Sequence, residues 1–501
     1  MKNQEVQLNL SIPKSIKEHY QIILITAIGF VLRLYMARMD PMLHDWDEKY
    51  HALVAKNMMV HPFKPMLYVH QYFSTDPYNW TNNHIWLHKQ PLFMWQMALS
   101  MKLFGVSELA IRLPSVVMGT LMIVLVYRIC FLTTGNKLSS VISGLLLCCS
   151  NYYLNLISGR QGMDHNDIAF GFYILASIWA YAEYIHQASL KWIILIGVFA
   201  GCAVLNKWLT GLLVFAPWGI QSLLDLIQTK KAKVILPLII GLLICIIVFA
   251  PWQFYILNCF PDLAKHEYAF NAEHIWKVVE KHEGDQWYYV NNFPLYFGKN
   301  VHFLIPLGLA IVFFKKSIDK KYKLLLILPT VIVFCFFNFI VQSKISGFFF
   351  IVAPMCIICI GIALQTIIDW FKHFRLWAAF ILISISVHWS LSIWRINMYT
   401  RDTRTLHVKI HNTKIYKRLD KLIPENIQVV INANPVEHVD IMFYSNRLEA
   451  YHSDISEAEF KSVTKNNIPI AAFESREGHR MPEYIANYKY LYIIKAPIIN
   501  Y

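Results

Sequence analysis

The chain has 501 residues, of which 56% are hydrophobic and only 16% are charged. Soluble domains carry about 25% charged residues, so this composition excludes an ordinary soluble protein and indicates an integral membrane protein. The net charge of +14 does not indicate a nucleic-acid groove, because most of the excess Lys and Arg lies in short loops between apolar segments. Membrane topology and anionic headgroups account for basic residues there.

Apolar segments of about 20 residues predict a polytopic α-helical membrane protein with eleven spans. The predicted spans are 21–39, 109–132, 138–157, 165–185, 191–206, 209–227, 234–256, 292–314, 323–341, 347–367 and 375–396. No small-residue cleavage site follows the first apolar run, so we expect it to stay as a helix. The segment 91–104 is too short to cross, and we expect an interfacial or re-entrant helix there.

The loops rich in Lys and Arg predict the orientation of these spans. Basic loops at 134–137, 186–191, 228–233, 315–323 and 369–375 fall on one side, which the positive-inside rule makes cytoplasmic. The opposite side receives 40–108, 159–164, 206–208, 258–291, 342–347 and everything after 396. We therefore expect a membrane domain at 1–396, with a first outer loop at about 40–108, and an outer domain at 397–501.

The pattern changes after residue 396. Short buried strands are predicted at 426–433, 468–473 and 489–496, separated by helical stretches at 437–445 and 456–463. We expect a small α/β domain on the outer side.

Three carboxylates, Asp45, Asp47 and Glu48, lie together at the start of the first outer loop. The apolar stripe of residues 46–58 predicts an amphipathic helix on the outer leaflet. A capping box formed by Asp45 and Glu48 would explain two of the acids, whereas a catalytic carboxylate at the membrane surface would explain Asp47. The pair Asp45 and Asp47 is also a candidate for binding a divalent cation, although a two-residue match is weak evidence.

Several basic side chains lie on the outer side, against the positive-inside bias: Lys89, Lys207, Lys344 and Arg160. Each alone is explained by a side chain reaching toward lipid headgroups, but together they favour an anionic ligand at the outer face. Asp164 and Asp167 begin a span and either cap its N-terminus or serve a function. His266, His274 and His282 recur every eight residues, a spacing untypical of metal ligands, so we interpret them as polar groups near a site.

Segments in one order along the chain resemble the GT-C glycosyltransferases that use a polyprenyl-phosphate sugar, namely the protein O-mannosyltransferases and the lipid A aminoarabinose transferases. The resemblance covers roughly 20–396. It rests on "DEKYHALVAKNM", "HKQPLFMW", "LFGVSELAIRLPSVV", "GRQGMD", "LNKWLTG", "APWQFYI", "AEHIWKVVEKHEGDQWYYV" and "QSKISGFFFIVAP".

This resemblance implies roles for individual residues. Asp47 is the expected general base, Asp164 would orient the acceptor or sugar, and Lys89 would bind the carrier phosphate. The remaining site residues that we expect are Glu48 among the catalytic acids and, for binding, Lys207, Lys344, Arg160, His274, Tyr50 and Asp45. Gln90, Lys277 and the pair Gly347-Phe348 depart from the family pattern, which leaves the donor sugar open.

The expected function is inverting transfer of a hexose or pentose from a polyprenyl-phosphate donor to a hydroxyl or phosphate acceptor. The reaction would take place at the periplasmic face of a bacterial inner membrane, with no required cofactor and a lipid, glycan or protein acceptor. A flippase of lipid-linked sugars and a non-catalytic glycan-assembly component are the alternatives. The clustering of charges at one face disfavours a transporter, whose ionisable residues lie near mid-span.

Overall fold

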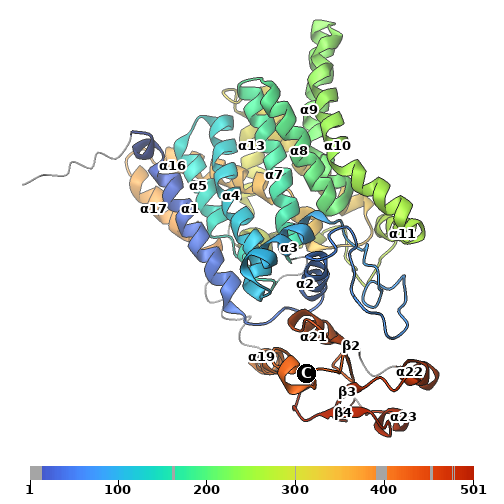
Figure 1. Cartoon of the computed structure of the whole chain (residues 1–501). Helices are drawn as coiled ribbons and strands as arrows, with labels where there is room; N and C mark the ends of the chain where they lie inside the picture. The colour runs from blue at the N-terminus through green and yellow to red at the C-terminus, as the bar shows by residue number, and fades with distance from the viewer. Residues whose placement is uncertain are drawn as a thin grey trace, which may run out of the picture.

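The computed structural model describes residues 14–160, 164–299, 301–390, 403–451, 455–476, 478 and 480–500. A bundle of long helices carries a small α/β domain at one end (Figure 1). The bundle consists of α1 (Lys14–Met39), α2 (Asp47–Met58), α3 (Leu92–Phe104), α4 (Glu108–Thr134), α5 (Lys137–Cys148), α6 (Asn151–Ile157), α7 (Asp164–His186), α8 (Leu190–Lys207), α9 (Phe215–Thr229), α10 (Leu236–Cys259), α11 (Pro261–Trp276), α12 (Tyr288–Phe297), α13 (Leu304–Phe314), α14 (Lys320–Cys335), α15 (Ser346–Phe350), α16 (Ala353–Trp370) and α17 (Arg375–Ser390).

Seven helical segments of the described chain are long and apolar enough to cross a membrane, or eight if the bent pair α5 and α6 is one span. The chain is therefore a multi-span membrane protein, and every predicted span range contains helix. The ranges 191–206 and 209–227 belong to one helical run, Leu190–Thr229. The range 292–314 is divided into α12 and α13 after Gly298, whose φ is +96°. The last range, 375–396, runs past residue 390, and its end lies outside the described residues.

A buried arginine stabilises the break between α5 and α6, which are bent by 45°. Arg33 of α1 donates hydrogen bonds to the carbonyl oxygens of Leu147 (3.0 Å) and Cys148 (3.1 Å) at the end of α5. The last carbonyls of a helix have no partner within the helix, and in a lipid-embedded bundle they need a donor. Arg33 therefore has a structural role in the middle of the membrane part.

Two glycines let α8 and α10 approach closely. A Cβ added at Gly197 would lie 2.6 Å from the carbonyl oxygen of Gly241, and one at Gly201 would lie 2.8 Å from that of Cys245. Small residues four apart allow such close backbone contact between membrane helices. This contact fixes α8, whose last residue is Lys207.

The C-terminal domain contains a four-stranded parallel sheet with the order β2-β1-β3-β4. Its elements are α19 (Thr403–Tyr416), α20 (Leu419–Leu422), β1 (Val429–Ile431), α21 (His438–Tyr444), β2 (Glu449–Ala450), α22 (Glu457–Thr464), β3 (Ile470–Phe473), α23 (Glu483–Ala486) and β4 (Leu491–Ile494). The three predicted strands and two predicted helices are confirmed, and the two-residue β2 was not predicted. The expected boundary between 396 and 397 lies outside the described residues.

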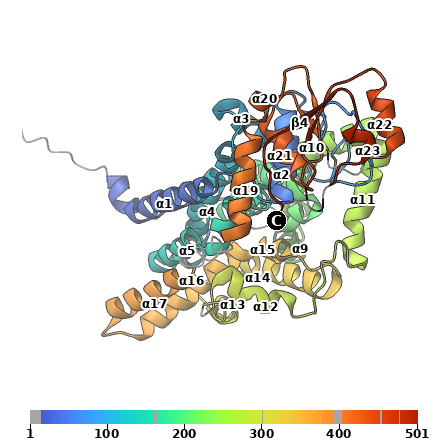
Figure 2. The same ribbon diagram turned by 90° about the horizontal axis from the view of Figure 1, so that it is seen from below.

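The prediction that residues 46–58 lie on the outer leaflet is wrong. Helix α2 lies at the end of the bundle, next to α21 of the C-terminal domain (Figures 1 and 2), and all of its residues except Asp47 and Lys56 are buried. Lys49 forms an ion pair with Asp440 at 2.6 Å, and Lys56 donates to the carbonyl oxygen of Met442 at 2.8 Å. The polar face that suggested contact with headgroups thus contacts protein.

Candidate active site

A cavity of about 520 Å³ brings together segments that are far apart in the sequence. It is lined by His88, Lys89 and Gln90 before α3, by Asn206 and Lys207 at the end of α8, by His274 of α11, and by Gly347 and Phe348 of α15. Much of the remaining wall is aromatic or aliphatic, including Trp208, Leu209, Phe270 and Phe337. The cavity therefore combines two ammonium groups and the carboxylate of Glu280 with a largely apolar wall.

Lys207 is held at one side of this cavity by a carboxylate. Its Nζ lies 2.6 Å from Asp167 Oδ1, and both side chains are largely buried. Trp208 directly after it has a φ of 67°, which ends α8 and starts the 3-10 helix Trp208–Val214. Such a backbone conformation is costly for a bulky residue and is typical of functional sites.

Lys89 is held by a neutral group rather than by a carboxylate. Its Nζ donates to His88 Nε2 at 2.9 Å, and His88 Nδ1 lies 3.2 Å from Glu267 Oε2. Burial holds the pKa of His88 well below its usual range, so this ring nitrogen accepts. Trp80 stacks on the His88 ring with centroids 5.0 Å apart. No carboxylate among the described residues forms an ion pair with Lys89, so its charge is available to an anion.

The charges of Asp47 and Lys207 both influence the pKa of Lys89. Burial lowers the pKa of Lys89, the negative charge of Asp47 opposes that shift, and the positive charge of Lys207 adds to it. The charges of Glu280 and Glu267 also oppose the shift, and a bound anion would further stabilise the two cations, which repel each other.

Asp47 is the first residue of α2, directly after Trp46, whose φ is 65°. The predicted capping box is wrong, because Trp46 is the N-cap and makes no side-chain capping bond. Asp47 Oδ1 lies 3.9 Å from Nε2 of His51, one turn further along α2. The other ring nitrogen, Nδ1, lies 2.8 Å from Oδ1 of Asp164. The structure thus brings Asp47 and Asp164 to the two edges of one imidazole.

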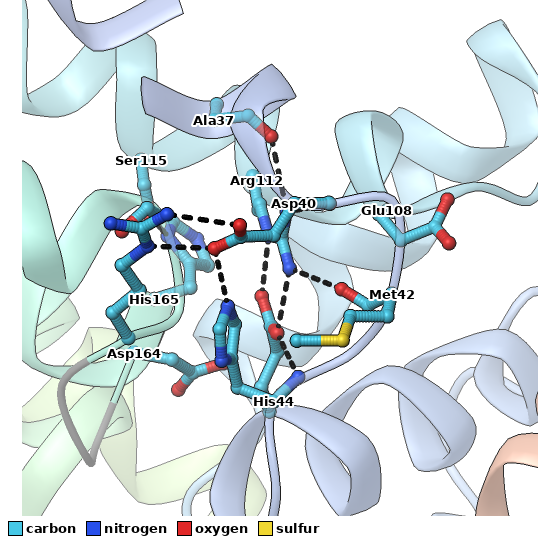
Figure 3. Close-up of polar contacts among 12 residues, drawn as sticks. Ala37, Asp40, Met42, His44, Glu108, Arg112, Ser115, Asp164 and His165 are labelled. Atoms are coloured by element: carbon cyan, nitrogen blue, oxygen red, sulfur yellow. Dashed lines mark hydrogen bonds and ion pairs between the residues drawn. The ribbon is translucent and has the colours of Figure 1, made fainter. Parts of the chain in front are cut away.

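Glu48 and Arg160 have partners away from the cavity. Glu48 forms a two-point ion pair with Arg112, at 2.6 and 2.9 Å, and Arg112 also donates to backbone carbonyls such as that of Met42 at 2.7 Å. Arg160 pairs with Asp40 at 2.7 and 2.9 Å. Figure 3 shows Asp40 and Arg112 at the centre of this network. The charges of Glu48 and Arg160 are both neutralised in buried ion pairs, and neither residue is among those that line the cavity.

The structure also places three expected binding residues outside the lining of the cavity: Lys344, Asp45 and Tyr50. Lys344 Nζ donates to the carbonyls of Phe337 (2.8 Å), Asn338 (2.9 Å) and Val341 (2.5 Å), and so satisfies the end of the π-helix Phe336–Ile340. Tyr50 is buried with its ring against Trp80, at a centroid distance of 5.0 Å.

Asp45 lies at the interface with the C-terminal domain. It pairs with Lys49 at 2.9 Å and with Lys409. Two ammonium groups thus already neutralise Asp45, one of the two carboxylates considered as a candidate pair for a divalent cation. The described part of the chain contains no group of three or more His, Cys, Asp or Glu side chains arranged to hold a metal ion.

Comparison with known proteins places this arrangement in a known fold. Residues 88–255 match the family model of the dolichyl-phosphate-mannose-protein mannosyltransferases. An uncharacterised protein of Aquifex aeolicus is 26% identical over 253 residues, which is 50% of this chain and only 44% of that protein. The structure of ArnT from Cupriavidus metallidurans bound to undecaprenyl phosphate superposes with a TM-score of 0.60, at 15% identity, over 93% of this chain and 90% of ArnT.

A second solved structure gives the same result. The archaeal oligosaccharyltransferase AglB from Archaeoglobus fulgidus, in complex with an inhibitory peptide and a dolichol-phosphate, superposes with a TM-score of 0.55 at 12% identity. The match covers 90% of this chain and 69% of AglB.

The chain has the GT-C fold.

Within this GT-C fold, sequence analysis did not identify His51 and His88, which contact expected site residues, or Glu267, which contacts His88. The spacing of four between Asp47 and His51 places both on one face of a helix and was an available signal. His88 directly precedes Lys89. Glu267 gave no signal, because 179 residues separate it from His88.

Proposed function

We propose that the protein is an inverting glycosyltransferase that moves a sugar from a polyprenyl-phosphate donor to an acceptor at the outer face of the bacterial inner membrane. One observation carries this proposal: Lys89 and Lys207 line the same cavity. In addition, Asp167 contacts Lys207, and the charge of Asp47 acts on Lys89.

The chemistry of a polyprenyl-phosphate donor fits these groups. When the bond between the anomeric carbon and the phosphate oxygen breaks, negative charge develops on the phosphate, and fixed ammonium groups stabilise it. We assign this role to Lys89 and Lys207. The apolar wall around Phe337 and Phe348 suits the start of a polyprenyl chain.

A carboxylate base completes the reaction. Asp47 is assigned to accept the proton of the acceptor group as that group attacks. A single displacement with a base opposite the leaving group inverts the anomeric centre and needs no covalent intermediate. No metal ion enters this scheme, because lysines supply the positive charge.

Two further observations support a polyprenyl phosphate as the sugar carrier and the outer side of the membrane as the place of the reaction. ArnT was solved with undecaprenyl phosphate and AglB with a dolichol-phosphate, both of which are polyprenyl-type phosphates. The connection between α9 and α10, which contains the basic segment 228–233, lies at the end of the bundle opposite the C-terminal domain (Figure 1). The positive-inside rule then assigns α2 and the cavity to the outer side.

Mass spectrometry of envelope lipids and glycoproteins would test the proposal. A deletion strain is complemented with wild type, Asp47→Asn or the control Asp262→Asn, an exposed acid at the start of α11. We expect one glycosylated product to disappear in the deletion strain, to return with wild type and Asp262→Asn, and to fall roughly 100-fold or more with Asp47→Asn. A full return of the product with Asp47→Asn would contradict the assignment of the base.

A further inference from the structure

His51 lies between two carboxylates in the interior of the protein. Its side chain is 0% exposed. Nδ1 lies 2.8 Å from Oδ1 of Asp164 on α7, and Nε2 lies 3.9 Å from Oδ1 of Asp47 on its own helix. The ring therefore lies between the proposed base and a second acid, neither of which is among the residues that line the cavity.

The ring is fixed in place, but one of its nitrogens has no hydrogen bond. Trp86 and Phe93 pack against it with ring centroids 5.6 and 4.7 Å away. Nε2 has no hydrogen-bond partner among the described residues. Buried polar atoms are nearly always bonded, and an exception next to an expected catalytic group points to a role in the reaction.

The contact with Asp164 determines which nitrogen carries the proton. An ionised carboxylate only accepts hydrogen bonds, so Nδ1 must be the N–H that donates to Asp164. In a neutral ring, Nε2 then has a lone pair. In this neutral tautomer, the atom directed at Asp47 is a proton acceptor.

We propose that His51 receives the acceptor's proton from Asp47, and that the acceptor is therefore an alcohol. This inference rests on the proposed glycosyl transfer. In that step the acceptor O–H bond breaks and the oxygen bonds to the anomeric carbon. The carbon–phosphate oxygen bond breaks, and its electron pair stays on the polyprenyl phosphate.

The proton moves first to the Asp47 carboxylate. A rotation of that side chain closes the 3.9 Å gap, and the proton passes to Nε2. The resulting imidazolium is stabilised by the charge of Asp164, as in an Asp–His pair. Asp47 is then a carboxylate again while the product is still bound, and the imidazolium later returns its proton through the partly exposed Asp47 side chain to water.

The relay distinguishes between the two acceptor classes. A hydroxyl must lose a proton during attack, whereas an ionised phosphate oxygen has none to give. A buried proton acceptor next to the base therefore assists the reaction only when the attacking group is a hydroxyl. The structure thus favours a sugar, lipid or protein hydroxyl over a phosphate group as acceptor.

Substitutions at His51 separate a relay from a merely structural contact. In His51→Asn, the short amide keeps a donor near Asp164 but has no group that faces Asp47. In His51→Gln, the longer amide reaches toward Asp47 but accepts no proton. We expect both purified variants to lose roughly 100-fold in kcat with an unchanged KM for the lipid-linked donor. The control His165→Gln changes a buried ring that is bonded to Ser115 and Gln96, and should keep kcat.

These outcomes separate the relay from the proposed function. If Asp47→Asn is inactive while His51→Asn keeps the wild-type kcat, the relay is wrong and the glycosyl transfer stands. If Asp47→Asn transfers at the wild-type rate, the proposed base is wrong. A transferred sugar found on a phosphate rather than on an oxygen of an alcohol would overturn the inferred acceptor class.

A measurement that does not depend on activity tests the tautomer. In nitrogen NMR of histidine-labelled wild type in detergent, the His51 signals are those missing from His51→Asn, or from His51→Gln if that variant folds better. We expect a protonated Nδ1 and an unprotonated Nε2 in the resting protein. A resting ring with a protonated Nε2 would overturn the relay.

Discussion

Glu449 makes the contact between the C-terminal domain and the first outer loop sensitive to pH. Its side chain is 6% exposed and accepts hydrogen bonds from the backbone N–H groups of Val69 (3.0 Å) and His70 (2.8 Å). Burial raises the pKa of Glu449 to about 7, although these two bonds and the charge of Lys56 partly oppose the rise. Glu449→Gln keeps the acceptor oxygen and removes the charge. We predict that this substitution abolishes the pH dependence that Glu449 gives to the stability of the contact.

The magnitude follows from the two pKa values of Glu449, about 7 in the folded protein and 4.5 for an unperturbed side chain. Between these values the folded state binds the proton more tightly, so the stability of the contact falls as pH rises from 4.5 to 7 and stays low above 7. The difference corresponds to about 3 kcal/mol. Burial also lowers the pKa of Lys56 to about 8. The destabilisation caused by burying this charged ammonium group decreases only as pH rises from about 8 toward 10.5, which is above the pH range in which Glu449 acts.

Hydrogen exchange of the amides in 67–73, corrected for the intrinsic rate, measures this contact at pH 5 and pH 8. The protection free energy of wild type should fall by up to about 3 kcal/mol between these pH values. Glu449→Gln should lose little, and the exposed control Glu425→Gln should behave like wild type. Equal losses in wild type and Glu449→Gln would refute the reasoning.

Glu48→Gln leaves the buried Arg112 guanidinium without its carboxylate, so we expect the free energy of unfolding to drop by about 3–5 kcal/mol; a thermal melt like that of wild type would contradict the structural role. Gly347→Ala would place a Cβ 2.5 Å from Asp167 Oδ2, displacing the carboxylate that holds Lys207 and lowering transfer. Gly219→Ala, where a Cβ meets open space, should not lower it, and equal activities would refute this explanation. EDTA should leave transfer intact, because lysines already neutralise Asp45; loss of transfer with recovery by Mg²⁺ would disprove that.

The helices and strands were largely predictable from the sequence, because apolar length and short buried runs depend on local composition. The environment of α2 was not predictable from the sequence. An amphipathic stripe shows that a helix has an apolar face, but it does not show whether the polar face meets water, headgroups or another domain. Lys49 and Lys56 on that face contact Asp440 and Met442, which are almost four hundred residues further along the chain.

The side of the membrane on which charged side chains lie was predictable from the sequence, but their interaction partners were not. The topology correctly grouped Lys89 and Lys207 on one side, and both line the cavity. It grouped Arg160 and Lys344 with them, yet these side chains are held by Asp40 and by backbone carbonyls. The pairing of Glu48 with Arg112, 64 residues away, depends on how α2 and α4 pack, which no local pattern specifies.

Binding of undecaprenyl phosphate, followed by native mass spectrometry of the detergent-solubilised protein, tests most directly whether Lys89 and Lys207 form one phosphate site. The control is Lys277→Met, since Lys277 is 67% exposed and is not among the residues that line the cavity. We predict that wild type and Lys277→Met retain the lipid and that the double variant Lys89→Met/Lys207→Met loses it. Retention of the lipid by the double variant at the wild-type level would contradict the proposed site.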